Sequence, residues 1–271
     1  MNLTTIEYRN EDGIATLTFN RPAKRNALDL IMRREIAEVV SAVNLDDSIR
    51  ALIVTGSGGS FCSGGDIATQ QTRKPGAQAG RLRMRDNWDW VQELIHLDRP
   101  VIAAVDGPAM GAGFNIALAA DFILATPRAT FGETFAKIGL VPDVGGLYLL
   151  PRIVGLQRAK EIVFSARTIS AEEARELSIV YEIHPEEELQ AAALELAKRV
   201  ATGSPTSFGM AKGILNGTFQ TELRTVLELE ASANGICFES EYHKEAIARF
   251  LKKETPIFVG LKSRSKSTAK S

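Results

Sequence analysis

Residues 101–146, with the sequence VIAAVDGPAMGAGFNIALAADFILATPRATFGETFAKIGLVPDVGG, decide the fold of this chain. The first five are β-branched residues and alanine, a composition typical of a strand that is buried on both faces. Gly111-Ala112-Gly113 then leads into a short apolar helix at about residues 114–120. Because the first N–H groups of a helix have no acceptor within it, this junction predicts an anion or oxyanion site.

Close packing of the strand against the helix is the alternative explanation for these small residues. Two nucleotide-binding motifs do not fit. Ile116 stands where the dinucleotide motif requires its third glycine, and neither this stretch nor residues 56–65 end in the Gly-Lys-Ser/Thr of a phosphate loop. The site is therefore not expected to hold a nucleotide through either motif.

The chain before this stretch predicts the start of a mixed sheet. Residues 6–9 and 14–19 are β-rich and flank a glycine-containing turn, which predicts an antiparallel hairpin. An amphipathic helix is predicted from an N-cap at Asp29 to about Asn44, then a buried strand at residues 51–55 and a helix at residues 81–97. Strand, helix and strand in this order predict a right-handed crossover and parallel pairing.

The chain after this stretch becomes helical. Residues 122–125 and 130–132 predict two further strands, and Ser170 with Glu173 forms a capping box at the start of a helix. We divide the chain into an α/β core at residues 1–200, a helical region at residues 201–260 and a disordered basic tail at residues 261–271. The helical region carries more apolar surface than it can bury alone, which predicts packing on another subunit.

The composition limits the possible partners. Of the 271 residues, 32 are Lys or Arg and 33 are Asp or Glu, so no strong overall field favours nucleic acid or an acidic membrane. Cys62 and Cys237 lie far apart and match no disulfide framework or metal-ligand spacing, which indicates a reducing compartment and no metal. The N-terminus lacks the apolar core of a signal peptide, and we predict a cytoplasmic protein without a membrane span.

Two loops that follow buried strands carry motifs of a known family. Residues 61–67, FCSGGDI, and residues 106–113, DGPAMGAG, resemble the two signatures of the crotonase (enoyl-CoA hydratase/isomerase) superfamily. Further similarity lies in order along almost the whole chain, at residues 20–22, 26–28, 131–132, 142–146 and 256–258. The resemblance implies an α/β, crotonase-like (ClpP/crotonase) spiral of ββα units with a helical C-terminal trimerisation region, assembled as a homotrimer or dimer of trimers.

The resemblance also implies an acyl-CoA substrate and no separate cofactor. The thioester carbonyl of such a substrate sits between two backbone N–H groups, here those of Gly65 and Ala112. Each such donor contributes about 3 kcal/mol to the stabilisation of negative charge that develops on the oxygen. The family motifs place the substrate and its CoA near Lys24, Arg25, Ala27, Ser63, Gly64, Asp66, Ile67, Gly111, Asn115 and Phe135. Solvation alone is the alternative explanation for the two basic residues of the early turn.

The chain departs from the hydratase pattern at both catalytic glutamates. The matching positions hold Asn115 and Phe135, neither of which can exchange a proton. Glu133 is offset by two residues, so we do not expect it to take an equivalent place. Hydration of the ordinary crotonase type is therefore disfavoured.

Asp143 is the acid that remains in the central segment. An aspartate before glycine can serve only as a turn former. This position, however, carries a catalytic aspartate in branches of the family that move double bonds, and residues 139–152 resemble the 1,2-epoxyphenylacetyl-CoA isomerase branch of phenylacetate degradation. We expect apolar neighbours Leu140, Val141 and Phe135 to raise the pKa of Asp143 and suit it to carrying a proton.

Other candidate side chains are interpreted as structural. Trp88 is expected in a helix core, although the alternative is that Trp88 and Trp90 line an acyl pocket. We interpret His96, His184 and His243, at helix ends or surfaces, as structural. We predict an enzyme that shifts a double bond or isomerises a ring in an enoyl-CoA-type thioester, through an enolate held by Gly65 and Ala112. The alternatives are an enoyl-CoA hydratase that uses Asp143 or Glu133, and a non-catalytic acyl-CoA or RNA-binding relative.

Overall fold

The computed structural model describes residues 1–68, 76–85 and 88–261. Apart from Leu261, the predicted basic tail lies outside the described residues.

A six-stranded sheet forms the centre of the molecule, with the strand order β1-β2-β3-β4-β6-β9. Its strands are β1 (Ile6–Glu11), β2 (Ile14–Phe19), β3 (Ala51–Gly56), β4 (Val101–Val105), β6 (Phe122–Ala125) and β9 (Glu182–Ile183). The first two form the predicted antiparallel hairpin, and every other neighbouring pair is parallel. The parallel pairs arise because helices connect these strands across the faces of the sheet.

A smaller three-stranded sheet stands beside it, with the order β5-β7-β8. Its members are β5 (Pro108–Met110), β7 (Thr130–Gly132) and β8 (Ile169–Ser170). Short strands β5 and β7 directly follow β4 and β6 along the chain, so each ββα unit contributes one strand to each sheet. This arrangement carries the chain from the buried sheet out to the candidate site.

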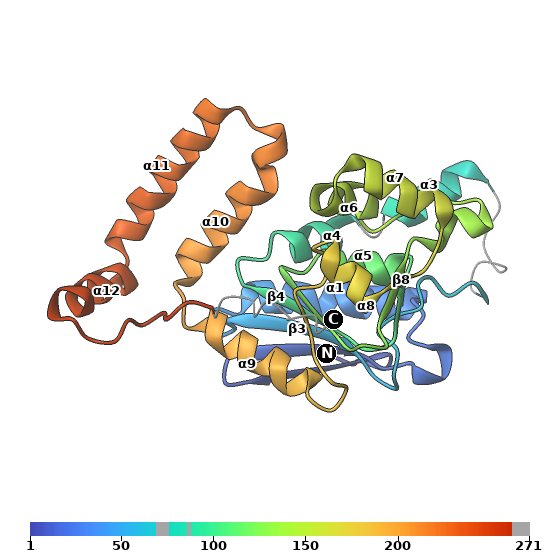
Figure 1. Cartoon of the computed structure of the whole chain (residues 1–271), viewed down its shortest axis with the longest axis horizontal. Coiled ribbons are helices and arrows are strands. Elements are labelled where there is room, and N and C mark those ends of the chain that lie inside the picture. Colours follow the sequence, from blue (N-terminus) through green and yellow to red (C-terminus); the bar gives the residue numbers. More distant parts are fainter. Residues whose placement is uncertain (69–75, 86–87, 262–271) are drawn as a thin grey trace, which may run out of the picture.

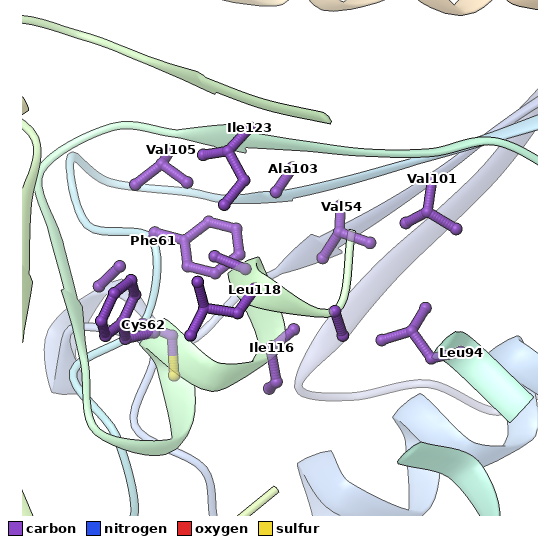
Figure 2. Packing of buried hydrophobic residues seen from close by; sticks show 14 of the residues in the cluster. Val54, Phe61, Cys62, Leu94, Val101, Ala103, Val105, Ile116, Leu118 and Ile123 are labelled. Atoms are coloured by element: carbon purple, nitrogen blue, oxygen red, sulfur yellow. The ribbon is translucent and has the colours of Figure 1, made fainter. Parts of the chain in front are cut away.

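Helices cover both faces of the large sheet (Figure 1). One face packs against α1 (Leu30–Leu45), α4 (Trp88–Ile95) and α5 (Ala112–Leu118), and the other against α9 (Leu189–Ala201). All five residues of β4 are buried, as its uninterrupted apolar run predicts. Figure 2 shows β4 residues Val101, Ala103 and Val105 in the same core as Phe61 and Ile116, so both signature loops are anchored on this core.

Capping residues set several helix boundaries. The Asp29 carboxylate accepts a hydrogen bond from Met32 N, and the Ser170 hydroxyl accepts one from Glu173 N at the start of α8 (Ala171–Glu176). The helix predicted at residues 81–97 corresponds to α3 (Ala77–Arg85) and α4, and residues 86–87 between them lie outside the described residues. Four residues of α4 are buried whereas α3 has none, so only the second segment is fixed by the core.

The last three helices, α10 (Pro205–Gly217), α11 (Leu223–Glu239) and α12 (Glu241–Lys252), extend away from the core (Figure 1). Their exposed large apolar residues are Leu215, Leu223, Leu227, Leu229, Ile236, Phe238, Ile247, Phe250 and Leu251. Within the part of the chain that the structure describes, no helix combines the length and the apolar character needed to cross a bilayer.

Candidate active site

The two signature loops lie side by side. Cys62 N donates to Pro108 O at 3.0 Å and Met110 N donates to Cys62 O at 2.9 Å, which forms a short parallel bridge between the loops. A Cβ atom on Gly113 would lie under 3.0 Å from the Cys62 carbonyl oxygen, closer than real Cβ atoms come. Glycine at this position is therefore what allows the loops to meet.

The candidate oxyanion donors Gly65 and Ala112 come from these two loops. Leu28 bonds to the residues on either side of Gly65, through Leu28 N to Gly64 O and Asp66 N to Leu28 O, so the N–H of Gly65 takes no part in that pairing. Ala112 is the first residue of α5, where an N–H has no acceptor within the helix. The Cβ position of Gly64 lies 3.9 Å from Ala112 N. The arrangement can present two N–H groups to one oxygen.

The early turn that resembles a CoA contact lies against the first loop. Ser63 N donates to Arg25 O at 3.0 Å, and Ser63 Oγ donates to Lys24 O at 3.4 Å. The side chains of Lys24 and Arg25 are exposed. Buried Asn26 fixes the turn, since its Nδ2 donates to the Ser60 carbonyl at 2.7 Å. The turn therefore holds two basic side chains beside the loop of Gly65, where CoA phosphates would be expected.

Other predicted contacts occupy different environments. Asp66 pairs with the Arg21 guanidinium at 3.1 Å, and the same guanidinium donates to the Ala27 carbonyl. These groups therefore hold the loop in shape. Ile67 is exposed. Phe135, in the short 3-10 helix η2 (Thr134–Ile138), places its ring 3.3 Å from the Cβ position of Gly111 and so covers the start of α5.

Asp143 lines a cavity of about 480 Å³. Its other lining residues come mainly from α3, α4 and α6 (Gly146–Val154), and are Met84, Trp88, Val91, Gln92, Ile95, His96, Val144, Gly145 and Tyr148. The predicted apolar neighbours are wrong in part, because Leu140 is 48% exposed and Val141 is 72% exposed. The chain passes through a left-handed turn at Gly139, and helix α4 supplies the apolar wall instead.

Trp88 is not the helix-core residue that the sequence favoured, whereas His96 lies exposed at the end of α4, as interpreted. Trp88 is 51% exposed and lines the cavity, whereas Trp90 is the tryptophan of the helix core. His96 lies on the same wall, with its Nδ1 3.0 Å from the Gln92 carbonyl oxygen. Helical periodicity gives the spacing of α4 but not which elements lie opposite each face, so the sequence alone could not place these side chains.

Asn115 positions the Asp143 loop from behind. Its side chain is fully buried, and its Nδ2 donates to the Asp143 carbonyl oxygen at 2.8 Å. A Cβ atom on Gly146 would lie under 3.0 Å from the Asn115 amide, so the loop packs directly on that amide. Asn115 does not line the cavity. Its side chain instead contacts the Asp143 carbonyl oxygen and the backbone at Gly146.

Glu133 does not line the cavity. It follows the buried strand β7 and is itself 0% exposed. Burial raises the pKa of Glu133 to about 8, the Asn115 amide opposes this rise, and the Asp143 carboxylate adds to it. The Asn115 side chain therefore lies close enough to act on this carboxyl group. An acid directly after two buried strand residues was the sequence signal for this group.

Comparisons with known proteins agree over nearly the whole chain. A model of the enoyl-CoA hydratase/isomerase family matches residues 9–261. The chain is 36% identical to 1,2-epoxyphenylacetyl-CoA isomerase of Escherichia coli, over 92% of the chain and 96% of that protein. It is 35% identical to a crotonyl-CoA hydratase of Syntrophomonas wolfei, over 96% and 99%. A crystal structure of an enoyl-CoA hydratase/isomerase from Cupriavidus metallidurans matches with a TM-score of 0.93 and 38% identity, over 98% of this chain and all of that one.

Proposed function

Because the chain belongs to the enoyl-CoA hydratase/isomerase family and has the predicted crotonase fold, we propose that it isomerises an enoyl-CoA-type thioester. The reaction is the shift of a double bond or the rearrangement of a ring. The observation that carries this proposal is Asp143, a carboxyl group on the cavity wall at a site where Asn115 and Phe135 replace the hydratase glutamates.

The proposed reaction conserves all atoms of the substrate. The Asp143 carboxylate takes a proton from the α carbon, and the C–H electron pair moves toward the thioester oxygen to give a dienolate. The N–H groups of Gly65 and Ala112 stabilise this oxygen, as preorganised donors do for developing negative charge. Asp143 then returns the proton to the γ carbon, so the double bond moves from C3–C4 to C2–C3. The chemistry draws on no further cofactor.

The cavity supports an apolar or aromatic acyl group. Trp88, Val91 and Ile95 of α4 are apolar residues in the wall of the cavity that Asp143 lines. Exclusion of water by such a wall protects the dienolate from side reactions. A linear enoyl chain and an aromatic ring both match this chemistry, and CoA would lie toward Lys24 and Arg25.

Hydration is the second candidate function. It is favoured by a second carboxyl group, Glu133, close to Asp143, and by hydratases among the relatives of similar identity. Glu133 does not line the cavity, however, and among the described residues Asp143 is the one carboxyl group in its wall. Isomerisation requires no water and is therefore preferred.

Two substrates separate these candidates. A 3-enoyl-CoA should gain the absorbance of a conjugated enoyl thioester when the protein is added, and crotonyl-CoA should keep it. Loss of that absorbance from crotonyl-CoA, with formation of 3-hydroxybutyryl-CoA, would instead establish a hydratase. Binding of both thioesters without turnover would support the non-catalytic alternative.

We also propose that the protein assembles as a homotrimer or a dimer of trimers. The exposed apolar residues of α10 to α12 support this, since such surfaces usually pack on a partner. Light scattering measures the assembly directly. The cytoplasmic location stays a prediction from the sequence.

A further inference from the structure

A buried polar cluster lies behind the cavity and is not part of its wall. Three acceptor atoms of this cluster, Asn115 Oδ1 and both carboxyl oxygens of Glu133, are buried and have no hydrogen-bond partner among the described residues. Both side chains are 0% exposed. Buried acceptors without donors are costly, and an ionised carboxylate is the costliest of them.

The cluster is joined to Asp143 by a defined contact. Asn115 Nδ2 donates to the Asp143 carbonyl oxygen at 2.8 Å. The backbone of Gly146, three residues further on, packs against the same amide. Any movement of the Asn115 side chain is therefore transmitted to the loop that carries the proposed base.

We propose that Glu133 is a positioning residue that keeps its proton at neutral pH and shares it with the Asn115 side chain, which fixes the Asp143 loop. The proposal rests on the proposed function of Asp143. The geometry supports the proposal because Asn115 Oδ1 is a buried acceptor without a donor, and a protonated Glu133 carboxyl group can donate to it. Glu133 does not reach the cavity, so it acts through Asn115 and not on the substrate.

The charges around Glu133 agree with a neutral acid. The Asp143 carboxylate acts on it from the loop before α6, and α5, which contributes Asn115, has no ionisable residue. Helices α7 (Leu156–Ser165) and α8 pack near β7 and η2, and their Glu161 and Glu173 are both paired with Arg167. Lys137, on η2 itself, is exposed. Ionisation of Glu133 would thus place a second negative charge near Asp143.

This arrangement predicts a loss of activity in alkaline solution. Burial raises the pKa of Glu133 to about 8, so the proton leaves and the cluster loses its donor above that pH. Glu133→Gln keeps a donor and cannot ionise. Its kcat should stay within about five-fold of wild type at neutral pH, the factor that one ordinary hydrogen bond represents. Its activity should then persist above pH 8, where that of the wild type falls. Glu133→Leu, which has no donor, should lose about ten-fold or more in kcat at every pH, with little change in KM.

Two measurements on the intact protein test the proposal. The first is the pH dependence of kcat with a 3-enoyl-CoA, for wild type and both variants. The second is amide hydrogen exchange of residues 139–150, corrected for the intrinsic effect of pH, which reports loop position without substrate. We expect exchange in this segment to accelerate above pH 8 in the wild type and to stay constant in Glu133→Gln. Glu35→Gln, at a buried acid held by Thr4 and Thr5, is the matched control and should follow the wild type in both measurements.

The outcomes separate this proposal from the proposed function. The role of Glu133 would be overturned if Glu133→Gln lost kcat above pH 8, and gained amide exchange in residues 139–150, to the same extent as the wild type. This holds even if isomerisation is observed. Absence of turnover of any enoyl-CoA by the wild type would overturn the proposed function. The exchange measurement would then still decide whether Glu133 fixes the loop.

Discussion

Replacement of Glu133 by glutamine should make the protein more stable, and by an amount that grows with pH. The pKa of Glu133 is raised from 4.5 to about 8 in the folded protein, so the folded state holds this proton more tightly than the unfolded state. The stability contributed by the neutral acid is therefore complete below about pH 4.5 and is lost as the pH rises toward 8. The change in pKa corresponds to at most about 5 kcal/mol above pH 8, because one pKa unit is about 1.4 kcal/mol.

Urea denaturation of both proteins across this pH range, at one fixed protomer concentration, measures the difference in the free energy of unfolding. The two proteins should differ by less than about 1 kcal/mol near pH 4.5, since the amide fills the same volume as the neutral acid. Above pH 8 the variant should be more stable by several kcal/mol.

The Glu35→Gln control should show the opposite sign. Burial raises the pKa of Glu35, but hydrogen bonds from Thr5 and Thr4 outweigh it and leave the pKa below its usual range. The ionised Glu35 therefore stabilises the fold above the pKa of the unfolded chain, and this stability is lost as the pH falls through the folded value. A difference for Glu133→Gln that does not change with pH would refute the assignment of a neutral, buried acid.

Three further substitutions test the geometry around the cavity. Gly146→Ala should displace the Asn115 amide, lower kcat by about ten-fold or more and cost about 1–3 kcal/mol of stability, the usual effect of overpacking; unchanged kcat would show that Asn115 does not position the loop. Gly113→Ala should push the two signature loops apart at Cys62 and lower kcat by about 100-fold, as loss of one oxyanion donor does; steady-state kinetics of the folded variant decides this. Trp88→Ala should leave the melting temperature within a few degrees of wild type because this side chain is half exposed, while kcat/KM falls more for long or aromatic acyl groups than for short ones; an equal fall for all acyl groups would remove Trp88 from the acyl pocket.

Local signals in the sequence were sufficient for five strands of the large sheet, all but β9, and for the helices capped by Asp29 and Ser170. The uninterrupted apolar run of β4 predicts burial on both faces of the strand, and all five of its residues are buried. The Ser170 side chain caps α8 by accepting a hydrogen bond from Glu173 N, three residues further along. The resemblance to the family then placed both signature loops and Asp143. These features depend on residues that are close together in the sequence.

The missed features depend on contacts between distant segments. Leu140 and Val141 precede Asp143 along the chain but are exposed and do not line its cavity, whose apolar wall comes mainly from α4. Glu133 was judged by its offset from a known position, whereas its environment is set by Asn115 from another element. The periodicity of a sequence does not indicate which side chains from distant segments lie against each other in the fold.

The most direct test of the account is the reaction of a 3-enoyl-CoA with wild type and Asp143→Asn. Asparagine keeps the shape of the side chain but cannot accept the proton. The account predicts that the wild type moves the double bond and exchanges the α-proton with solvent, and that Asp143→Asn does neither while it still binds the thioester. Double-bond migration by Asp143→Asn at the wild-type rate would contradict the claim that Asp143 carries the proton.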